Sequence, residues 1–125
     1  MTDVKIVDAS ALGAVLFAEP GGDAVAAQLR CGQLVAPSLL GYEIANVCLF
    51  KIRANPEQRT DFLTAFANWT EMGIELVTVD HASVLSVAEQ CSLTSYDASY
   101  LWLARRLGGE LITLDRQLRR AMSVR

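Results

Sequence analysis

The sequence predicts an α/β fold with a parallel sheet covered by helices on both faces, and three observations support this prediction. Short apolar runs rich in β-branched residues alternate with longer stretches of helical spacing, which is typical of strand–helix–strand units. Connections of that length join strands in parallel, with right-handed crossovers. The chain has 125 residues, of which 52% are hydrophobic, enough for one compact core. We therefore expect a single domain spanning residues 1–125.

The first strand is the reference point for the rest of the chain. It begins at Val4, runs through Ile6 and Val7, and ends abruptly at the carboxylate of Asp8. A helix is expected to follow at residues 11–17. Ligands of α/β folds bind at the carboxyl ends of the strands, where neighbouring loops converge. Other acids in the chain are therefore judged by whether they can reach Asp8.

Turn and cap residues delimit the remaining elements. Glu19-Pro20-Gly21-Gly22 ends the first helix, Ser38 is positioned as an N-cap, and Gly108 is positioned as a C-cap. The helices on either side of Asn55-Pro56 are expected to form a hairpin. The expected elements are, in order, a helix at 23–29, a strand at 34–36, helices at 39–54 and 57–71, a strand at 74–79, helices at 81–92 and 96–107, a strand at 111–114 and a short terminal helix.

Composition narrows the functional classes. A net charge of −3 lacks the excess of Lys and Arg that sequence-independent nucleic-acid binding uses. No stretch approaches the roughly 18 apolar residues of a membrane span, and no basic segment precedes an apolar one at the start, so we expect a cytoplasmic protein. The spacing of Cys31, Cys48 and Cys91 fits neither a zinc site nor a disulfide framework. We expect these cysteines to be small buried or half-buried residues.

Positive charge is concentrated near the C-terminus. From Ser99 onward the sequence contains six arginines and two acids. Arg116, Arg119 and Arg120 fall on one face of the expected terminal helix. This face is either a solvated helix surface or a patch that contacts phosphates.

Four acids stand out by their positions. Asp8 and Asp115 each follow a strand, Asp97 opens a helix, and Glu43 lies within a helix. Each position except that of Glu43 also has a purely structural explanation. Asp8 and Asp115 are positioned as N-caps, and Thr94 with Asp97 fits a capping box in which the acid reaches back to the Thr94 amide.

Glu43 is harder to explain structurally. At helical spacing it shares a stripe with Leu39, Asn46, Val47 and Phe50, which predicts that the acid faces the core. A buried carboxylate must find partners or a cation, because burying an unpaired charge costs several kcal/mol. Exposure of this face to solvent is the alternative.

Acids at the strand ends and helix starts of one parallel sheet can converge on a common cleft. Carboxylates held that close repel one another unless a divalent cation neutralises them, and oxygen-only ligands favour Mg²⁺ or Mn²⁺ over zinc. Such a site suits phosphodiester hydrolysis. His81 directly follows Asp80, a predicted N-cap, and is expected to be an exposed first-turn residue, not a catalyst.

Four short motifs resemble, in order, the signature of PIN-domain nucleases. They are Val7-Asp8-Ala9-Ser10, Tyr42-Glu43-Ile44-Ala45-Asn46, Ser95-Tyr96-Asp97-Ala98-Ser99-Tyr100 and Ile112-Thr113-Leu114-Asp115. The length of the chain is similar to that of VapC-type toxins from toxin–antitoxin pairs. The match departs from the family at residues 116–121, which lack the aromatic residue often found after the fourth acid.

The resemblance implies a three-layer α/β/α sandwich and an endoribonuclease that depends on Mg²⁺ or Mn²⁺. It assigns the catalytic and metal-ligating roles to Asp8, Glu43, Asp97 and Asp115. It also assigns supporting roles, in orienting the acids or a water, to Ser10, Asn46 and Thr113. Its further implications are a homodimer and a cognate antitoxin protein whose C-terminal tail lies across the active-site groove.

Two other interpretations stay open at this point. A structure-specific DNA nuclease is one, although the chain lacks long basic or extra helical segments for gripping a duplex. A non-catalytic regulatory domain that uses the acids as caps or to bind Mg²⁺ is the other. Its receiver-type version is disfavoured, because the first strand ends in Asp8-Ala9-Ser10 instead of paired acids.

Overall fold

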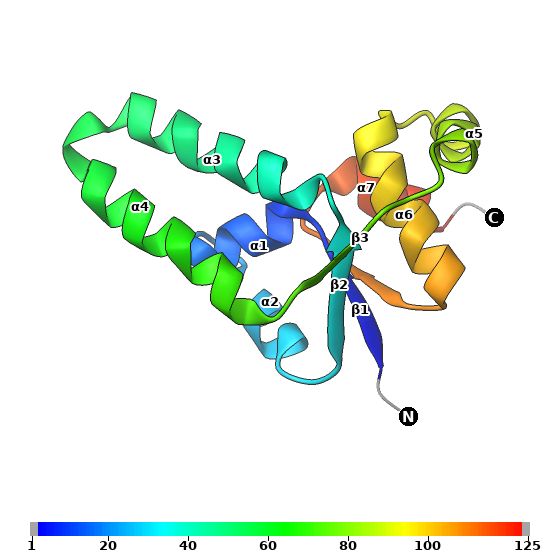
Figure 1. The fold of residues 1–125 in the computed structure, drawn as a ribbon, viewed down its shortest axis with the longest axis horizontal. Helices are drawn as coiled ribbons and strands as arrows, with labels where there is room; N and C mark the ends of the chain where they lie inside the picture. The colour runs from blue at the N-terminus through cyan, green and yellow to red at the C-terminus, as the bar shows by residue number, and fades with distance from the viewer. Residues whose placement is uncertain (1–2, 124–125) are drawn as a thin grey trace.

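A four-stranded parallel sheet lies between two layers of helices (Figure 1) in the computed structural model, which describes residues 3–123. The strands are β1 (Val4–Val7), β2 (Gln33–Pro37), β3 (Glu75–Val77) and β4 (Glu110–Ile112). Their order is β3-β2-β1-β4, so β1 is central and pairs with both β2 and β4. The predicted α/β/α architecture with a parallel sheet is confirmed.

Seven α-helices cover the sheet within the described residues. Those on one side in Figure 1 are α1 (Ala9–Leu16), α2 (Gly22–Leu29), α3 (Leu40–Ala54) and α4 (Arg59–Ala67). Those on the other side are α5 (His81–Cys91), α6 (Ser95–Leu107) and α7 (Arg116–Ala121). None of the helices within residues 3–123 is long and apolar enough to span a bilayer.

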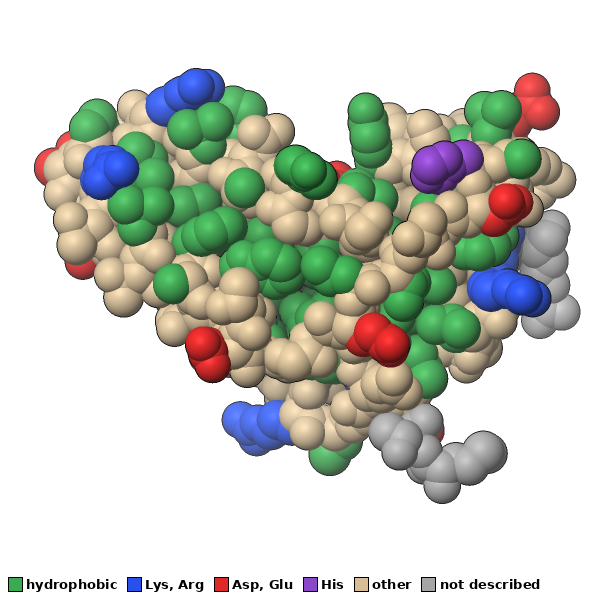
Figure 2. Space-filling model, viewed as in Figure 1, with side chains coloured by type: hydrophobic (Ala, Val, Ile, Leu, Met, Phe, Trp, Pro, Cys, Tyr) green, Lys and Arg blue, Asp and Glu red, His purple; other side chains and the backbone are tan. Residues whose placement is uncertain are grey.

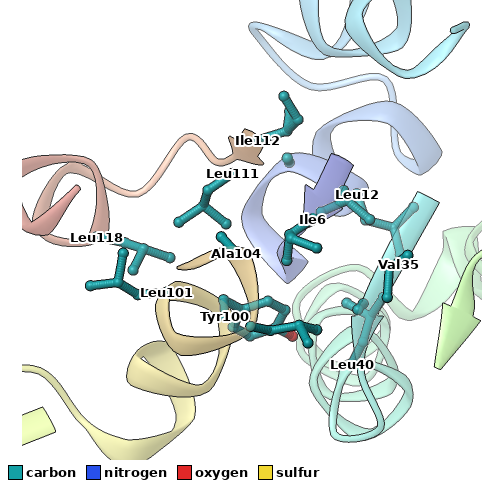
Figure 3. Packing of buried hydrophobic residues seen from close by; sticks show 14 of the residues in the cluster. Ile6, Leu12, Val35, Leu40, Tyr100, Leu101, Ala104, Leu111, Ile112 and Leu118 are labelled. Carbon is teal, nitrogen blue, oxygen red and sulfur yellow. The ribbon is translucent and has the colours of Figure 1, made fainter. Parts of the chain in front are cut away.

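The hydrophobic core lies on both faces of β1, whose Ile6 and Val7 are completely buried. Leu12 of α1 and Leu40 of α3 pack from one layer, and Tyr100 of α6 packs from the other (Figure 3). Each fully buried side chain of this size stabilises the fold by about 1.5–3 kcal/mol. The core therefore fixes the starts of α1, α3 and α6 relative to the end of β1.

The predicted hairpin is formed by α3 and α4, but its second helix is shorter than expected. Two 3₁₀ turns, η1 (Pro56–Gln58) and η2 (Asn68–Met72), flank α4, and no residue of α4 is fully buried. Phe62 packs edge-on against Phe17 with ring centroids 6.2 Å apart. Lys51 forms a salt bridge with Glu19 at 2.6 Å. The hairpin is thus attached mainly along α3 and at its aromatic contacts.

Two local predictions are wrong. Ser38 does not cap α3: its amide continues the pairing of β2 with β3 by donating to the Val77 carbonyl at 2.9 Å, and the cap position is Leu39, where no side chain makes a capping hydrogen bond. Cys31 is exposed because it lies in the turn before β2, whereas Cys48 is buried and Cys91 half-buried as expected.

Candidate active site

Asp8 lies at the carboxyl end of β1 and is only 4% exposed. Its Oδ1 accepts hydrogen bonds from the Ser10 hydroxyl at 2.7 Å and from the Ala11 amide at 2.9 Å, and the second bond caps α1. Its Oδ2 accepts a hydrogen bond from the Thr113 hydroxyl at 2.5 Å. The predicted N-cap role is therefore real, but it uses only part of the carboxylate's capacity to accept hydrogen bonds.

Ser10 and Thr113 connect the end of β1 to the segment after β4. The Ser10 hydroxyl accepts a hydrogen bond from the Leu114 amide at 2.9 Å and lies 3.2 Å from the Thr113 hydroxyl. The Thr113 hydroxyl accepts from the Asp115 amide at 3.0 Å. This network orients Asp8 and also sets the position from which Asp115 begins α7.

Asp115 caps α7 by accepting a hydrogen bond from the Leu118 amide at 2.8 Å. The first turn is further held by Arg119, whose Nη2 donates to the Thr113 carbonyl at 2.6 Å. The side chain of Asp115 stays half-buried. A single local structure therefore fixes Thr113 and Asp115 together.

Asp97 lies in the first turn of α6, where its amide donates to the Thr94 hydroxyl at 3.1 Å. The predicted N-cap is therefore present. The reciprocal bond of a capping box, from the Thr94 amide to the Asp97 carboxylate, is not found among residues 3–123. This half-buried carboxylate accepts no hydrogen bond within the described part of the chain, so a cap does not account for it.

Glu43 in the first turn of α3 accepts a hydrogen bond from the Tyr100 hydroxyl, with 2.6 Å between Oε1 and the phenol oxygen. Tyr100 is 1% exposed and its ring lies between α6 and the start of α3, beside Leu40 (Figure 3). Burial and the nearby Glu43 raise the pKa of Tyr100 far above its usual range. The phenol therefore remains a donor to Glu43.

The four acids form one electrostatic cluster. Burial raises the pKa of Asp8, and the charge of Asp115 raises it further, against the lowering effect of the Thr113, Ala11 and Ser10 hydrogen bonds. Burial likewise raises the pKa of Glu43 and of Asp97, and negative neighbours add to both shifts. Asp97 and Asp8 act on Glu43, and Asp115 and Asp8 act on Asp97. Asp8, Glu43 and Asp97 therefore lie within electrostatic reach of one another, and the charge of Asp115 acts on two of them, Asp8 and Asp97.

The helical stripe predicted for Glu43 is rotated in the structure. The core-facing positions of α3 are Leu40, Ile44 and Cys48, so Glu43 lies at the edge of this face and is half-buried. Asn46 is exposed and makes no hydrogen bond within residues 3–123, although it lines the same cavity as Glu43. The structure therefore gives Asn46 no contact by which it supports an acid.

Figure 2 shows a notch between the starts of α3 and α6, with hydrophobic side chains on both sides and a small patch of acidic surface visible within it. The notch opens at the carboxyl end of the sheet. This is where a parallel α/β fold places its ligands.

The donor set suits a hard divalent cation. All four acids offer oxygen atoms as ligands, and a bound cation would relieve the repulsion between their negative charges. No group of three or more His, Cys, Asp or Glu side chains in the described chain is arranged to hold a metal ion by itself. Mg²⁺ characteristically uses one or two carboxylates and completes its shell with water and substrate phosphate. The residues present therefore fit Mg²⁺ or a similar ion bound in that open manner.

Acids near the carboxyl edge of a parallel sheet are a feature of metal-dependent α/β nucleases among other classes, and comparison with known proteins gives the family. The PIN domain model matches residues 5–122. Ribonuclease VapC3 from Pyrobaculum aerophilum is 32% identical over 118 residues, which cover 90% of each chain. The crystal structure of PAE2754 from Pyrobaculum aerophilum matches with a TM-score of 0.75 and 28% identity, over 98% of this chain and 89% of that one. The chain belongs to the PIN-domain family.

Sequence reasoning missed the role of one residue in the site. Tyr100 lies in the third PIN-like motif, but its position along the chain does not predict that it donates to Glu43. A signal was available, because Tyr100 lies three residues after Asp97 and so falls on the same face of α6.

Proposed function

We propose that this protein is a VapC-type toxin, an endoribonuclease that hydrolyses RNA phosphodiester bonds with Mg²⁺ or Mn²⁺. One observation supports the proposal: Asp8, Glu43 and Asp97, from three separate elements, lie close enough for their charges to act on one another, and burial together with this repulsion raises the pKa of each. The membership of the PIN family and the likeness to Ribonuclease VapC3 support it. We also propose that residues 1–125 form one nuclease domain.

Asp8, Glu43, Asp97 and Asp115 are the proposed metal-ligating and catalytic acids. These residues would hold a divalent cation, and the chemistry it would supply there is a lower pKa for an attacking water and neutralisation of charge on the phosphate. One carboxylate oxygen of Glu43 accepts the hydrogen bond from Tyr100, and the other is available to a metal ion. Asp97, which accepts no hydrogen bond within the described chain, is suited to take a proton from water.

The supporting residues act through the acids. Ser10 and Thr113 hold both oxygens of Asp8 and so keep the carboxylate from turning away when charge in the cleft changes. This pre-organisation matters because small displacements of catalytic groups cost large factors in rate. Asn46 is proposed only as a group lining the groove.

We propose three further properties from the family assignment. The protein pairs with a cognate antitoxin protein that covers the acidic cleft, it forms a homodimer, and it acts in the cytoplasm on RNA. An antitoxin would need a basic side chain to match the cluster of acids.

The test is cleavage of single-stranded RNA and of DNA of the same sequence by the purified protein, with Mg²⁺, with Mn²⁺ and with EDTA. RNA cuts that need both the metal and Asp97 are expected, with Asp97→Asn as the inactive control. Cleavage of DNA alone would replace the proposal with a DNA nuclease. Metal binding without cleavage of either polymer, after any antitoxin has been stripped, would favour a regulatory domain.

A further inference from the structure

Residues 113–115 form a short connection between β4 and α7 and belong to neither element. Their backbone groups cannot all be satisfied by a strand or a helix, so side chains must supply partners. The connection matters for the site because Thr113 donates to Asp8 and Asp115 is itself one of the four acids. Whatever holds this connection therefore also sets the positions of two acids.

The peptide unit between Thr113 and Leu114 is held at both ends. Its carbonyl oxygen, which belongs to Thr113, accepts a hydrogen bond from Nη2 of Arg119 at 2.6 Å. Its amide, which belongs to Leu114, donates to the hydroxyl oxygen of Ser10 at 2.9 Å. The carbonyl and the amide of a trans peptide point in opposite directions, so the two hydrogen bonds together fix the plane of this unit.

Both carboxylate oxygens of Asp8 depend on this peptide unit. Ser10, which accepts from the Leu114 amide, donates to Oδ1 of Asp8 at 2.7 Å. Thr113, which supplies the carbonyl, donates through its hydroxyl to Oδ2 at 2.5 Å. The contacts thus lead from Arg119 through one peptide unit to each oxygen of the first acid.

Arg119 also contacts the chain on both sides of the Asp115 side chain. Its backbone amide donates to the Asp115 carbonyl at 3.0 Å, and its side chain reaches back to Thr113. The Thr113 hydroxyl in turn accepts from the Asp115 amide at 3.0 Å. A displacement of Asp115 would therefore disturb the bond between Arg119 and Thr113.

The charge of Arg119 strengthens these contacts. Hydrogen bonds from an ionised donor are roughly twice as strong as those between neutral groups. A charged donor on the carbonyl also polarises the peptide, which makes the amide of the same unit a better donor to its own partner. The effect of Arg119 therefore extends along the hydrogen bonds that end at Asp8.

We propose that Arg119 is a positioning residue of the acid site and that it sets the affinity for the divalent cation by holding the Thr113–Leu114 peptide unit. This inference rests on the metal site of the proposed ribonuclease function and adds to that site a residue outside the four acids. Arg119 acts through Thr113, and its effect reaches Asp8 and Asp115.

The direction of the effect separates positioning from charge. A positive charge near a cluster of acids opposes the binding of a cation, so loss of the charge alone would strengthen metal binding. Loss of the bond to Thr113 leaves the acids less well oriented, which weakens metal binding. Arg120 is exposed and makes no hydrogen bond within residues 3–123, so its removal changes the charge without changing any such contact.

The test measures metal affinity in the full chain, without RNA. Mn²⁺ is titrated into metal-free protein, and electron paramagnetic resonance reports the free ion. Arg119→Met keeps the aliphatic part of the side chain but removes the donor, and it is expected to weaken Mn²⁺ binding roughly tenfold. Arg119→Lys keeps a charged donor and is expected to recover part of the affinity. Arg120→Met is expected to bind Mn²⁺ as tightly as the wild type or slightly more tightly.

A stability control separates positioning from a general loss of structure. Leu29 is buried at the end of α2, just before β2 begins, and so lies near the amino edge of the sheet, away from the acids. Leu29→Ala is expected to lower the Tm by leaving a cavity. It should still bind Mn²⁺ like the wild type at temperatures well below its Tm.

The outcomes distinguish this proposal from the proposed function. Wild-type or tighter Mn²⁺ binding by Arg119→Met, with a wild type that cuts RNA, would overturn the role of Arg119 and leave the ribonuclease intact. An equal loss of affinity in Leu29→Ala would also overturn it. If Arg119→Met does not fold, Arg119→Gln replaces it under the same criterion. A wild type that binds Mn²⁺ but cuts no RNA would overturn the ribonuclease alone, and one that does neither would overturn both.

Discussion

Tyr100 is the residue on which the orientation of Glu43 depends. Removing its hydroxyl in Tyr100→Phe leaves a half-buried carboxylate without its donor, which is expected to cost about 1–2 kcal/mol of unfolding free energy. Because partners of metal ligands tune affinity, binding of Mg²⁺ is expected to weaken about tenfold. Calorimetric titration of the metal and urea unfolding measure the two effects.

The matched control is Tyr96→Phe, which removes an exposed hydroxyl from the same helix and is expected to change neither quantity. If Tyr100→Phe bound Mg²⁺ as tightly as the wild type, the hydroxyl would have a packing role only. Circular dichroism confirms that both variants keep their helix content.

The carboxylate of Asp97 combines burial with like-charge neighbours and has no donor in the described chain. Asp97→Asn is expected to lower kcat about a hundredfold or more, as expected for loss of a catalytic electrostatic group. It is also expected to raise the Tm of the metal-free protein by about 1–2 °C, because a half-exposed, screened repulsion is worth a few tenths of a kcal/mol. Scanning calorimetry in EDTA checks the second effect, and a lower Tm would contradict the repulsion argument.

At the scale of single residues, the capping side chains could be predicted because their roles are local. Asp8, Asp115 and Thr94 are predicted as caps, and each accepts a hydrogen bond from an amide three residues further on. The contact of Tyr100 with Glu43 spans 57 positions and depends on how α6 packs against α3. The spacing of residues along the chain does not predict how two distant helices pack against each other.

Among the elements, α7 carries two neighbouring arginines that differ in their contacts. Arg119 donates to the Thr113 carbonyl, whereas Arg120 is exposed and has no hydrogen bond within residues 3–123. Arg119→Ala is expected to lower the unfolding free energy by about 1 kcal/mol, and Arg120→Ala to leave it unchanged. Urea unfolding of the two variants side by side makes the comparison.

Charge reversal at the same positions tests the phosphate hypothesis for α7. Arg120→Glu is expected to weaken RNA binding and to reduce its salt dependence, because one phosphate contact is lost. Equal affinity at low salt would leave Arg120 as a solubilising residue. Arg119 is the less informative position, since its reversal would also disturb Thr113.

The ends of helices were predicted correctly where a helix-ending residue marks them. The core-facing side of a helix was predicted wrongly where the spacing of apolar residues is ambiguous. Gly108 and Asn55 ended helices as expected. The predicted core-facing stripe of α3 starts one residue before the observed one. Leu39 and Leu40 each begin a series of apolar residues at helical spacing, and half-buried Val47 fits both series. Only the packing of Leu40, Ile44 and Cys48 in the core decides between them. The break of the 57–71 helix likewise has no strong signal beyond its mixed polarity.

For the molecule as a whole, the acid cluster sets how stability depends on pH. Asp8, Glu43 and Asp97 have raised pKa values in the folded state. Between the ordinary carboxyl pKa of about 4 and those raised values, the folded chain binds more protons than the unfolded one. The unfolding free energy therefore falls as pH rises through this window, and the full penalty is present once pH exceeds the raised pKa values.

Metal-free protein is accordingly expected to become more resistant to urea as pH is lowered from 7 to about 5. Mg²⁺ at pH 7 should restore much of the difference by neutralising the cluster. Asp97→Asn should give a shallower pH dependence than the wild type. A urea midpoint that falls over this range would contradict the sign. The pKa of exposed Asp80 is lowered by the hydrogen bonds that its carboxylate accepts from Ser83, and this acts in the opposite direction but at more acidic pH.

The bond between Asp8 and Thr113 joins groups 105 positions apart, and β4, which precedes Thr113, pairs directly with β1. During synthesis, Thr113 is added to the chain 105 positions after Asp8. A growing chain therefore cannot orient Asp8 through this bond until β4 and the residues after it have been made and have paired with β1. Assembly of the site is thus expected to be a late event in the folding of the newly made chain.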